Sequence, residues 1–384
     1  MKKYILILFF MTVTAFSQQY EKKWSQILVQ ENKGKIKTAT ELVDAIYKKA
    51  KKENNEVQII KCFFYKSKYL QVLEEDAQSK IIRNLKAEIN TATIPSKAIL
   101  NLVYAKCLSD YNEEYENFGV AVVDSSSLEN ENSENLIDSA TVNGYNTSED
   151  IDKIFEKTLE NEATLKTTAL TNYESIFNFF TLEKLKKENL FDYLLKENIA
   201  FYKSKINEWQ FEAKQFEAHK DNLLGHSDAF IKLKLELIED ESLKKVLSLY
   251  QKLEADAPTI ENKLERILFC SNYLLKSDEN LLTTLLDLEK QSSENIPLQK
   301  IKLEKATIFG KLASKETHPD YNNKALAELE SILNTNNNSN TFKLAQQAKE
   351  ELLSKTILIE TQKNTYSNEH ARAFIRYKNT DNLT

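Results

Sequence analysis

The scarcity of glycine and proline constrains the fold of this chain more than any other feature of its sequence. Only 5 Gly and 4 Pro occur in 384 residues, whereas the tight turns of sandwiches, barrels and Rossmann folds depend on these two residue types. Helices joined by short polar turns need few of them. The composition therefore predicts a mainly α-helical protein.

Apolar side chains recur at the 3.6-residue period of a helix along much of the chain. In the region 18–110, Trp24 and Leu28 are expected on the buried side of one helix. Gly34 and Ala39 follow at the spacing of a tetratricopeptide-type turn and second helix, although no clean 34-residue repeat is present. We expect antiparallel helix pairs in a tetratricopeptide-like or α-solenoid arrangement.

A second helical region is predicted at 151–353. Its clearest apolar stripe, which should be buried, consists of Phe191, Leu195, Ile199, Tyr202 and Ile206. Within this region, Phe230 to Ile238 instead alternates apolar and charged residues, the two-residue period of a half-buried strand. We therefore predict one strand among these helices.

The final segment, 354–384, reads as the beginning of a β domain. Ile357 to Gln362 and Ala371 to Lys378 are two predicted strands separated by a polar turn. Two strands are not stable by themselves. We therefore expect the domain, and the protein, to continue beyond this sequence.

The first 17 residues have the pattern of a secretory signal peptide. Lys2 and Lys3 precede an apolar run from Tyr4 to Phe16, and Ala15 and Ser17 fit a small-x-small cleavage site. A retained membrane anchor is the alternative, but the run is shorter than the roughly 20 residues that span a bilayer. We expect a secreted, periplasmic or cell-envelope protein with no membrane span after cleavage.

An acidic segment interrupts the helical pattern, and we predict a flexible insertion at 111–150. From Cys107 to Asp152, with Asp152 included, there are 12 Asp and Glu residues but no Lys or Arg, and Ser and Asn fill much of the remainder. The carboxylates lack the spacing of a calcium-binding loop. A solvated loop is favoured over a cation-binding or partner-binding segment.

Charge and cysteine content limit the possible partners and the redox state. The net charge of −6 is spread along the chain, which opposes binding to nucleic acid or an anionic membrane and favours a protein partner. Cys62, Cys107 and Cys270 lie far apart, and buried thiols are the expected state. A single disulfide in an exported protein stays open as the alternative, with Cys62 and Cys107 the favoured pair.

No catalytic, cofactor-binding or metal-binding residue is predicted. His219 and His226 are seven residues apart without a zinc signature, while His318 and His370 stand alone in polar turns. The glycines are isolated, so no phosphate-binding loop is present, and no nucleophile motif occurs. We expect a protein that is not an enzyme.

Several stretches, in order along the chain, resemble the N-terminal helical region of large secreted α2-macroglobulin-like proteins from Bacteroidetes-type bacteria. The matching stretches are Tyr20 to Leu70, Phe191 to Tyr202, Leu249 to Cys270, Tyr321 to Leu333 and Ala371 to Leu383. The last of these, ARAFIRYKNTDNL, is similar to the entry into a first macroglobulin β domain.

The resemblance implies a helical platform placed before the β domains of a protease-trap or inhibitor family. No Cys-x-Glu-Gln thioester motif and no bait segment occur in this sequence, so no functional residue of the family is transferred. The expected function is a non-catalytic scaffold that contacts a protease or the protein's own downstream domains. The alternative is a self-standing tetratricopeptide-like binding module of the bacterial envelope.

Overall fold

The chain divides into two compact units between Ala200 and Phe201. The computed structural model describes residues 19–75, 77–117, 148–177, 186, 188–206, 211–236, 238–313, 318, 320–335, 339–362, 364 and 370–380. The predicted signal peptide lies outside these residues, as does the predicted acidic insertion between 118 and 147. The ends of that insertion are helical, because one helix continues to Asn117 and the next begins at Ser148.

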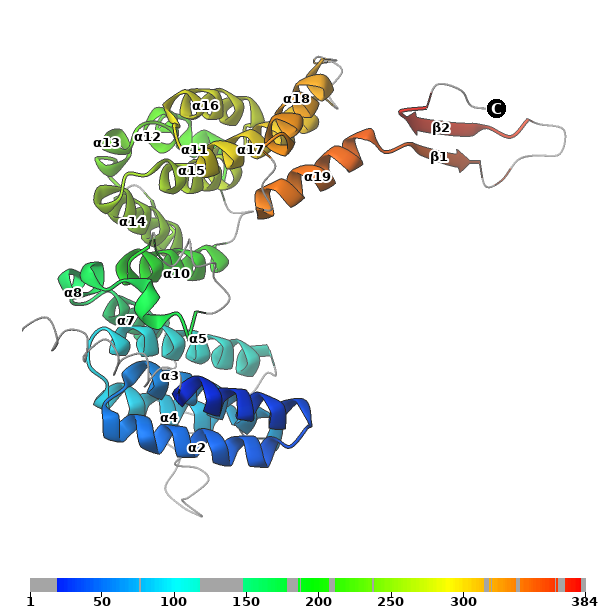
Figure 1. Cartoon of the computed structure of the whole chain (residues 1–384). Coiled ribbons are helices and arrows are strands. Elements are labelled where there is room, and N and C mark those ends of the chain that lie inside the picture. Colours follow the sequence, from blue (N-terminus) through cyan, green and yellow to red (C-terminus); the bar gives the residue numbers. More distant parts are fainter. Residues whose placement is uncertain are drawn as a thin grey trace, which may run out of the picture. The chain divides into compact units, whose positions relative to one another are not determined.

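The described part of the chain is mainly helical, as the scarcity of turn residues predicts (Figure 1). In the first unit, a helix at 19–32 is followed by α2 (Ile36–Glu53), α3 (Glu56–Leu73), α4 (Ala77–Thr91), α5 (Ser96–Asn117), α7 (Ser148–Thr158), α8 (Glu162–Thr167) and the 3₁₀ turn η2 (Leu170–Tyr173). The next helix, α10 (Leu190–Ser204), runs from the first unit into the second.

The second unit consists of three short helices, a longer helical series and a β-hairpin. Its elements are α11 (Ala213–Glu217), α12 (Lys220–Leu224), α13 (Ser227–Ile231), α14 (Glu241–Asp256), α15 (Ile260–Phe269), the π-helical turn η4 (Cys270–Leu275), α16 (Asp278–Gln291), α17 (Asn295–Ala313), α18 (Tyr321–Leu333), α19 (Asn340–Leu353), β1 (Thr356–Thr361) and β2 (Ala373–Lys378). The strand bounds agree with the predicted strands to within two residues.

The core of the first unit begins where the helix at 19–32 packs on α2 and α3. Tyr20, Trp24 and Ile27 are buried there against Ala39, a residue small enough to let neighbouring helices approach. Leu28 was expected on this buried side, but it is 42% exposed. The spacing of Trp24 and Ile27 places the apolar stripe one residue earlier, so Leu28 faces away from the core.

Gly34 forms the turn between the helix at 19–32 and α2. Its φ of +70° lies in the left-handed region, which favours glycine. The Gly34 N–H donates to the Glu31 carbonyl at 2.8 Å, and the next N–H donates to the Gln30 carbonyl at 3.0 Å. These bonds occupy carbonyls left free at the helix end, and the chain reverses into α2.

Several helices of the second unit begin at a side-chain cap. Asp240 accepts the Leu243 N–H at 2.6 Å before α14, and Thr259 accepts the Asn262 N–H at 3.2 Å before α15. Such caps satisfy backbone donors that have no partner within the helix. The sequence therefore marks the start of each of these helices with a capping side chain.

A buried lysine ties α16, α17 and α18 together. The Lys305 side chain is only 4% exposed, and its ammonium lies 2.5 Å from carboxylate oxygens of both Glu289 and Glu328. The two carboxylates supply the partners that a buried cation requires. These three helices therefore share one polar contact inside their apolar packing.

The strand predicted at Phe230 to Ile238 is wrong. Phe230 and Ile231 end helix α13, and no described residue of the segment forms a strand. The Gln251 side chain donates to the carbonyls of Phe230 at 2.9 Å and Leu233 at 2.8 Å. The alternating pattern does not form a strand here, because these backbone carbonyls bond to a side chain and not to a second strand.

The apolar stripe predicted on the α10 segment is confirmed. Each of its side chains is at most 8% exposed: Phe191, Leu195, Ile199, Tyr202 and Ile206. The last of them lies just beyond the helix end at Ser204. The helical period therefore identified this buried face correctly.

Candidate interaction surface

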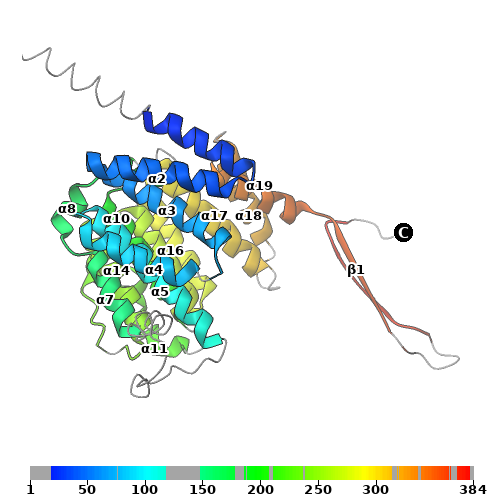
Figure 2. The same ribbon diagram turned by 90° about the horizontal axis from the view of Figure 1, so that it is seen from below.

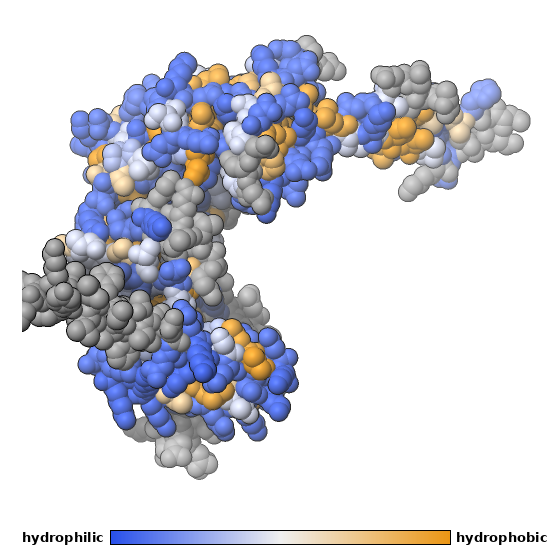
Figure 3. Space-filling model, viewed as in Figure 1, coloured by the Kyte–Doolittle hydropathy of each residue, from blue (hydrophilic) through white to orange (hydrophobic). Residues whose placement is uncertain are grey.

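The hairpin of β1 and β2 is the least covered structure in the described part of the second unit. Every residue of both strands is exposed. In Figures 1 and 2 the hairpin extends away from the end of α19, and Figure 3 shows apolar surface upon it. An uncovered sheet of this kind is unusual in a stable fold, because two strands alone bury too little apolar surface.

The register of the hairpin separates an apolar face from a mixed one. Directly opposed residues of antiparallel strands share a face, and Ile357 pairs with Tyr377 while Ile359 pairs with Ile375. These four side chains are 46–59% exposed. One face therefore presents a continuous apolar surface, which we call the apolar hairpin face.

The opposite face of the hairpin carries charge. It holds the pairs Leu358 with Arg376 and Glu360 with Phe374, and the Arg376 guanidinium lies 5.5 Å from the centre of the Phe374 ring. Such a cation–π contact keeps the aromatic ring partly covered in water. This face can remain in contact with water, whereas the apolar hairpin face would be stabilised by burial.

The base of the hairpin is fixed to the end of α19. Lys378 donates to the Glu351 carbonyl at 2.8 Å, and Asn379 donates to the carbonyls of Leu352 at 2.9 Å and Ser354 at 3.1 Å. These bonds satisfy carbonyls at a helix C-terminus, where a positive charge is also favourable. The hairpin is therefore held in a set direction where it leaves the helix.

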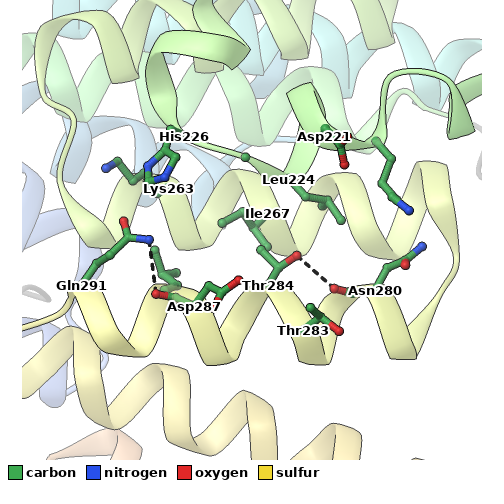
Figure 4. Close-up of a pocket in the computed structure, with 13 residues that line it drawn as sticks. Asp221, Leu224, His226, Lys263, Ile267, Asn280, Thr283, Thr284, Asp287 and Gln291 are labelled. Atoms are coloured by element: carbon green, nitrogen blue, oxygen red, sulfur yellow. Dashed lines mark hydrogen bonds between the residues drawn. The ribbon is translucent and has the colours of Figure 1, made fainter.

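A second candidate is a polar pocket of about 470 Å³ formed by α12, α15, α16 and the turn after α12 (Figure 4). Charged and hydrogen-bonding side chains line it together with apolar side chains. The lining includes Lys220, Asp221, Leu224, Gly225, His226, Lys263, Ile267, Asn280, Thr283, Thr284, Asp287, Leu288 and Gln291.

The turn that forms one wall of this pocket is fixed by a buried ion pair. Arg266 and Glu254 have fully buried side chains, and the Arg266 Nε lies 2.5 Å from a Glu254 oxygen. The same guanidinium donates to the carbonyls of Leu223 and Gly225, the latter at 2.8 Å. Ser227 donates to the second Glu254 oxygen at 2.6 Å. The network satisfies both charges and links α12, α13, α14 and α15.

The histidines singled out in the sequence are not brought together. His226 lines the polar pocket, whereas His219 lines a different, more apolar cavity beside Phe211 and Leu243. His318 stacks on Tyr321 with 4.3 Å between ring centres, and His370 is exposed just before β2. Within the described residues, no cluster of three His, Cys, Asp or Glu side chains is placed to bind a metal ion.

The three cysteines are free thiols, so the alternative of a Cys62–Cys107 disulfide is not realised. Cys62 and Cys270 are buried as expected, while Cys107 is half-buried. Burial raises the pKa of Cys62 and of Cys270 to about 12, and that of Cys107 to about 11. These thiols therefore stay protonated at neutral pH, which makes them poor nucleophiles.

Neither a family model, nor a curated protein, nor a solved structure matches this chain. Among the helices described, none is both long enough and apolar enough to cross a bilayer.

Proposed function

We propose that this chain is a non-catalytic helical scaffold that forms the N-terminal part of a secreted α2-macroglobulin-like protein. In this proposal the scaffold presents its β-hairpin to a β domain of the same protein. The observation that carries it is the apolar hairpin face of Ile357, Ile359, Ile375 and Tyr377, which no described residue covers. The resemblance of Ala371 to Leu383 to the entry of a macroglobulin domain supports the same reading.

The hairpin has the two features that a joining β domain would use. Its outer strand edges carry backbone donors and acceptors that can pair with further strands, and its apolar face can pack against a second sheet. The side chains of this face are already about half buried, so covering them completely contributes roughly half of the 1.5–3 kcal/mol that full burial of a large apolar side chain gives. A β domain therefore gains both a template and a packing surface.

The helices would serve as a rigid support for this joint. Successive helices α16, α17, α18 and α19 pack on one another in chain order, which is the local packing expected of helix pairs in a solenoid. The bonds from Lys378 and Asn379 to the end of α19 couple this series to the hairpin. The scaffold thereby sets the direction in which a following β domain begins.

The size and location of the native protein test this proposal. An antibody raised against the chain, which has a mass of 44.4 kDa, is used to probe whole cells, periplasmic extract and culture medium. The proposal predicts an antigen several times heavier than the chain, outside the cytoplasm. A cytoplasmic antigen, or one of the chain's own mass, contradicts it.

The alternative is a self-standing tetratricopeptide-like binding module, and one observation in the first unit favours it. A groove of about 450 Å³ lies among α2, α3 and α4, with Phe63, Leu70 and Leu73 on its α3 side and Tyr47 and Glu88 on the neighbouring helices. Grooves between paired helices suit an amphipathic segment of a partner. An extracytoplasmic antigen of the chain's own mass supports this alternative.

A further inference from the structure

The polar pocket of the second unit contains charged side chains that the fold itself does not use. The side chains of His226, Lys263 and Asp221 make no hydrogen bond or ion pair with any residue that the structure describes. The other two charged side chains of the lining are paired, Lys220 with Glu217 at 3.5 Å and Asp287 with Lys290 at 2.8 Å. Gln291 donates to the Asp287 carbonyl at 3.2 Å and Thr284 to the Asn280 carbonyl at 2.9 Å. The unused groups are therefore the ones available to a ligand.

The unused charges are separated within the pocket. Figure 4 shows His226 and Lys263 toward one end and Asp221 toward the other. Leu224 and Ile267 lie between them in this view, and Leu288 also lines the pocket. This pattern matches a ligand that carries an anionic group, a short aliphatic or backbone portion and a cationic group.

The wall that carries His226 is held in place more firmly than a surface turn usually is. Gly225 precedes it, and a Cβ at that position would lie 2.1 Å from the Asp221 carbonyl oxygen, so the close approach of the chain requires glycine. The buried Arg266 guanidinium binds the carbonyls on both sides of Leu224. A fixed wall lowers the entropy lost when a ligand binds, because the site is already ordered.

We propose that this pocket binds a short peptide segment of a partner protein. An acidic side chain of that segment lies against Lys263 and His226, and a basic side chain lies against Asp221. A volume of about 470 Å³ accommodates a few residues but not a folded domain. The pocket contains no residue of the hairpin. If the pocket binds no peptide, the proposed scaffold function is unaffected, and if the scaffold proposal is wrong, the peptide site is unaffected.

Peptide selection followed by affinity measurement tests the proposal. Random hexapeptides displayed on phage are selected on the whole chain and, in parallel, on the Lys263→Met and Lys263→Glu variants. Lys244→Met serves as the matched control, since Lys244 lies in the same unit, outside the pocket lining, and is similarly accessible. Far-UV circular dichroism checks that each variant keeps its helices.

The proposal predicts that the unaltered chain and the Lys244→Met variant enrich the same peptides, each with an acidic residue. The synthetic form of an enriched peptide should bind the Lys263→Met variant about tenfold or more weakly, because one charge-assisted contact is lost. The Lys263→Glu variant should instead enrich peptides with Lys or Arg at the acidic position. A merely structural role for Lys263 would not reverse the charge preference.

Three results would overturn the proposal. The first is a selection in which no peptide is enriched on the unaltered chain relative to the Lys263→Met variant. The second is an enriched set without an acidic residue, which would assign the pocket to a different chemistry. The third is equal affinity of an enriched peptide for the unaltered chain and both Lys263 variants.

Discussion

Replacing Arg266 with methionine should destabilise the second unit far more than removing a surface lysine. The substitution leaves the Glu254 carboxylate buried without its cation and removes the donors to the carbonyls of Leu223 and Gly225. Breaking a buried pair from one side costs about 3–5 kcal/mol in other proteins. We expect a loss of about that size for the α12–α15 region.

Hydrogen exchange measured by mass spectrometry gives this loss locally, so it does not depend on how the two units unfold relative to each other. A loss of about 3 kcal/mol corresponds to exchange about a hundredfold faster in peptides from α14 and α15. The matched control is Lys244→Met, whose exposed pair with Glu241 should contribute less than about 1 kcal/mol.

A double variant separates the charge effect from lost packing. In Glu254→Met with Arg266→Met, no buried charge is left, so part of the stability lost in the single variant should return. The recovery should be incomplete, because the carbonyls of Leu223 and Gly225 still lack their donors. The reasoning is refuted if the single variant stays within about 1 kcal/mol of the unaltered chain, or if the double variant is less stable than the single one.

Three further predictions concern a pH effect, the thiols and the hairpin. Hydrogen bonds from Lys68 and Tyr69 hold the pKa of Glu31 below its ordinary 4.5, so this group stabilises the first unit above that pH, and the contribution is lost as pH falls through the lowered pKa. Urea unfolding should show that the free energy of unfolding falls less between pH 7 and pH 3 for Glu31→Gln than for the unaltered chain. An equal fall in both proteins would exclude the effect. Ellman's reagent at pH 8 should react slowly with Cys62 and Cys270, whose pKa burial raises to about 12, and fully after unfolding in urea. Rapid reaction of these two thiols in the native state would contradict their burial. Replacing Ile359 and Ile375 together with threonine should change unfolding free energy by less than about 0.5 kcal/mol per site yet lower the binding of an apolar fluorescent dye, whereas a large stability loss would mean that the hairpin face is already covered.

The helices and the final strands were predictable because local rules determine them. The stripe that includes Leu195 and Ile199 follows the helical period, and Asp240 and Thr259 cap the helices that follow them. Two short apolar runs separated by a polar turn identified both strands of the last segment. Periodicity placed Leu28 on the wrong side of its helix. A shift of one residue along the helix is enough to move a side chain from the buried side to the exposed side.

The polar pocket and its supporting network could not be predicted from the sequence. Arg266 lies between Glu265 and Ile267 in LERILFC, but nothing local indicates that its charge turns inward to meet Glu254. The pocket residues His226, Lys263 and Asp287 come from three separate segments and form no motif. Their convergence depends on tertiary packing, which short-range spacing does not record.

Backbone hydrogen exchange of the hairpin in the native protein tests the scaffold account most directly. The measurement compares amides of β1 (Thr356–Thr361) and β2 (Ala373–Lys378) in antigen purified from its natural source with those in the isolated chain. If a β domain joins this hairpin, the outward-facing amides of its strand edges exchange at least about tenfold more slowly in the native protein. Equal exchange in the two samples would contradict the account.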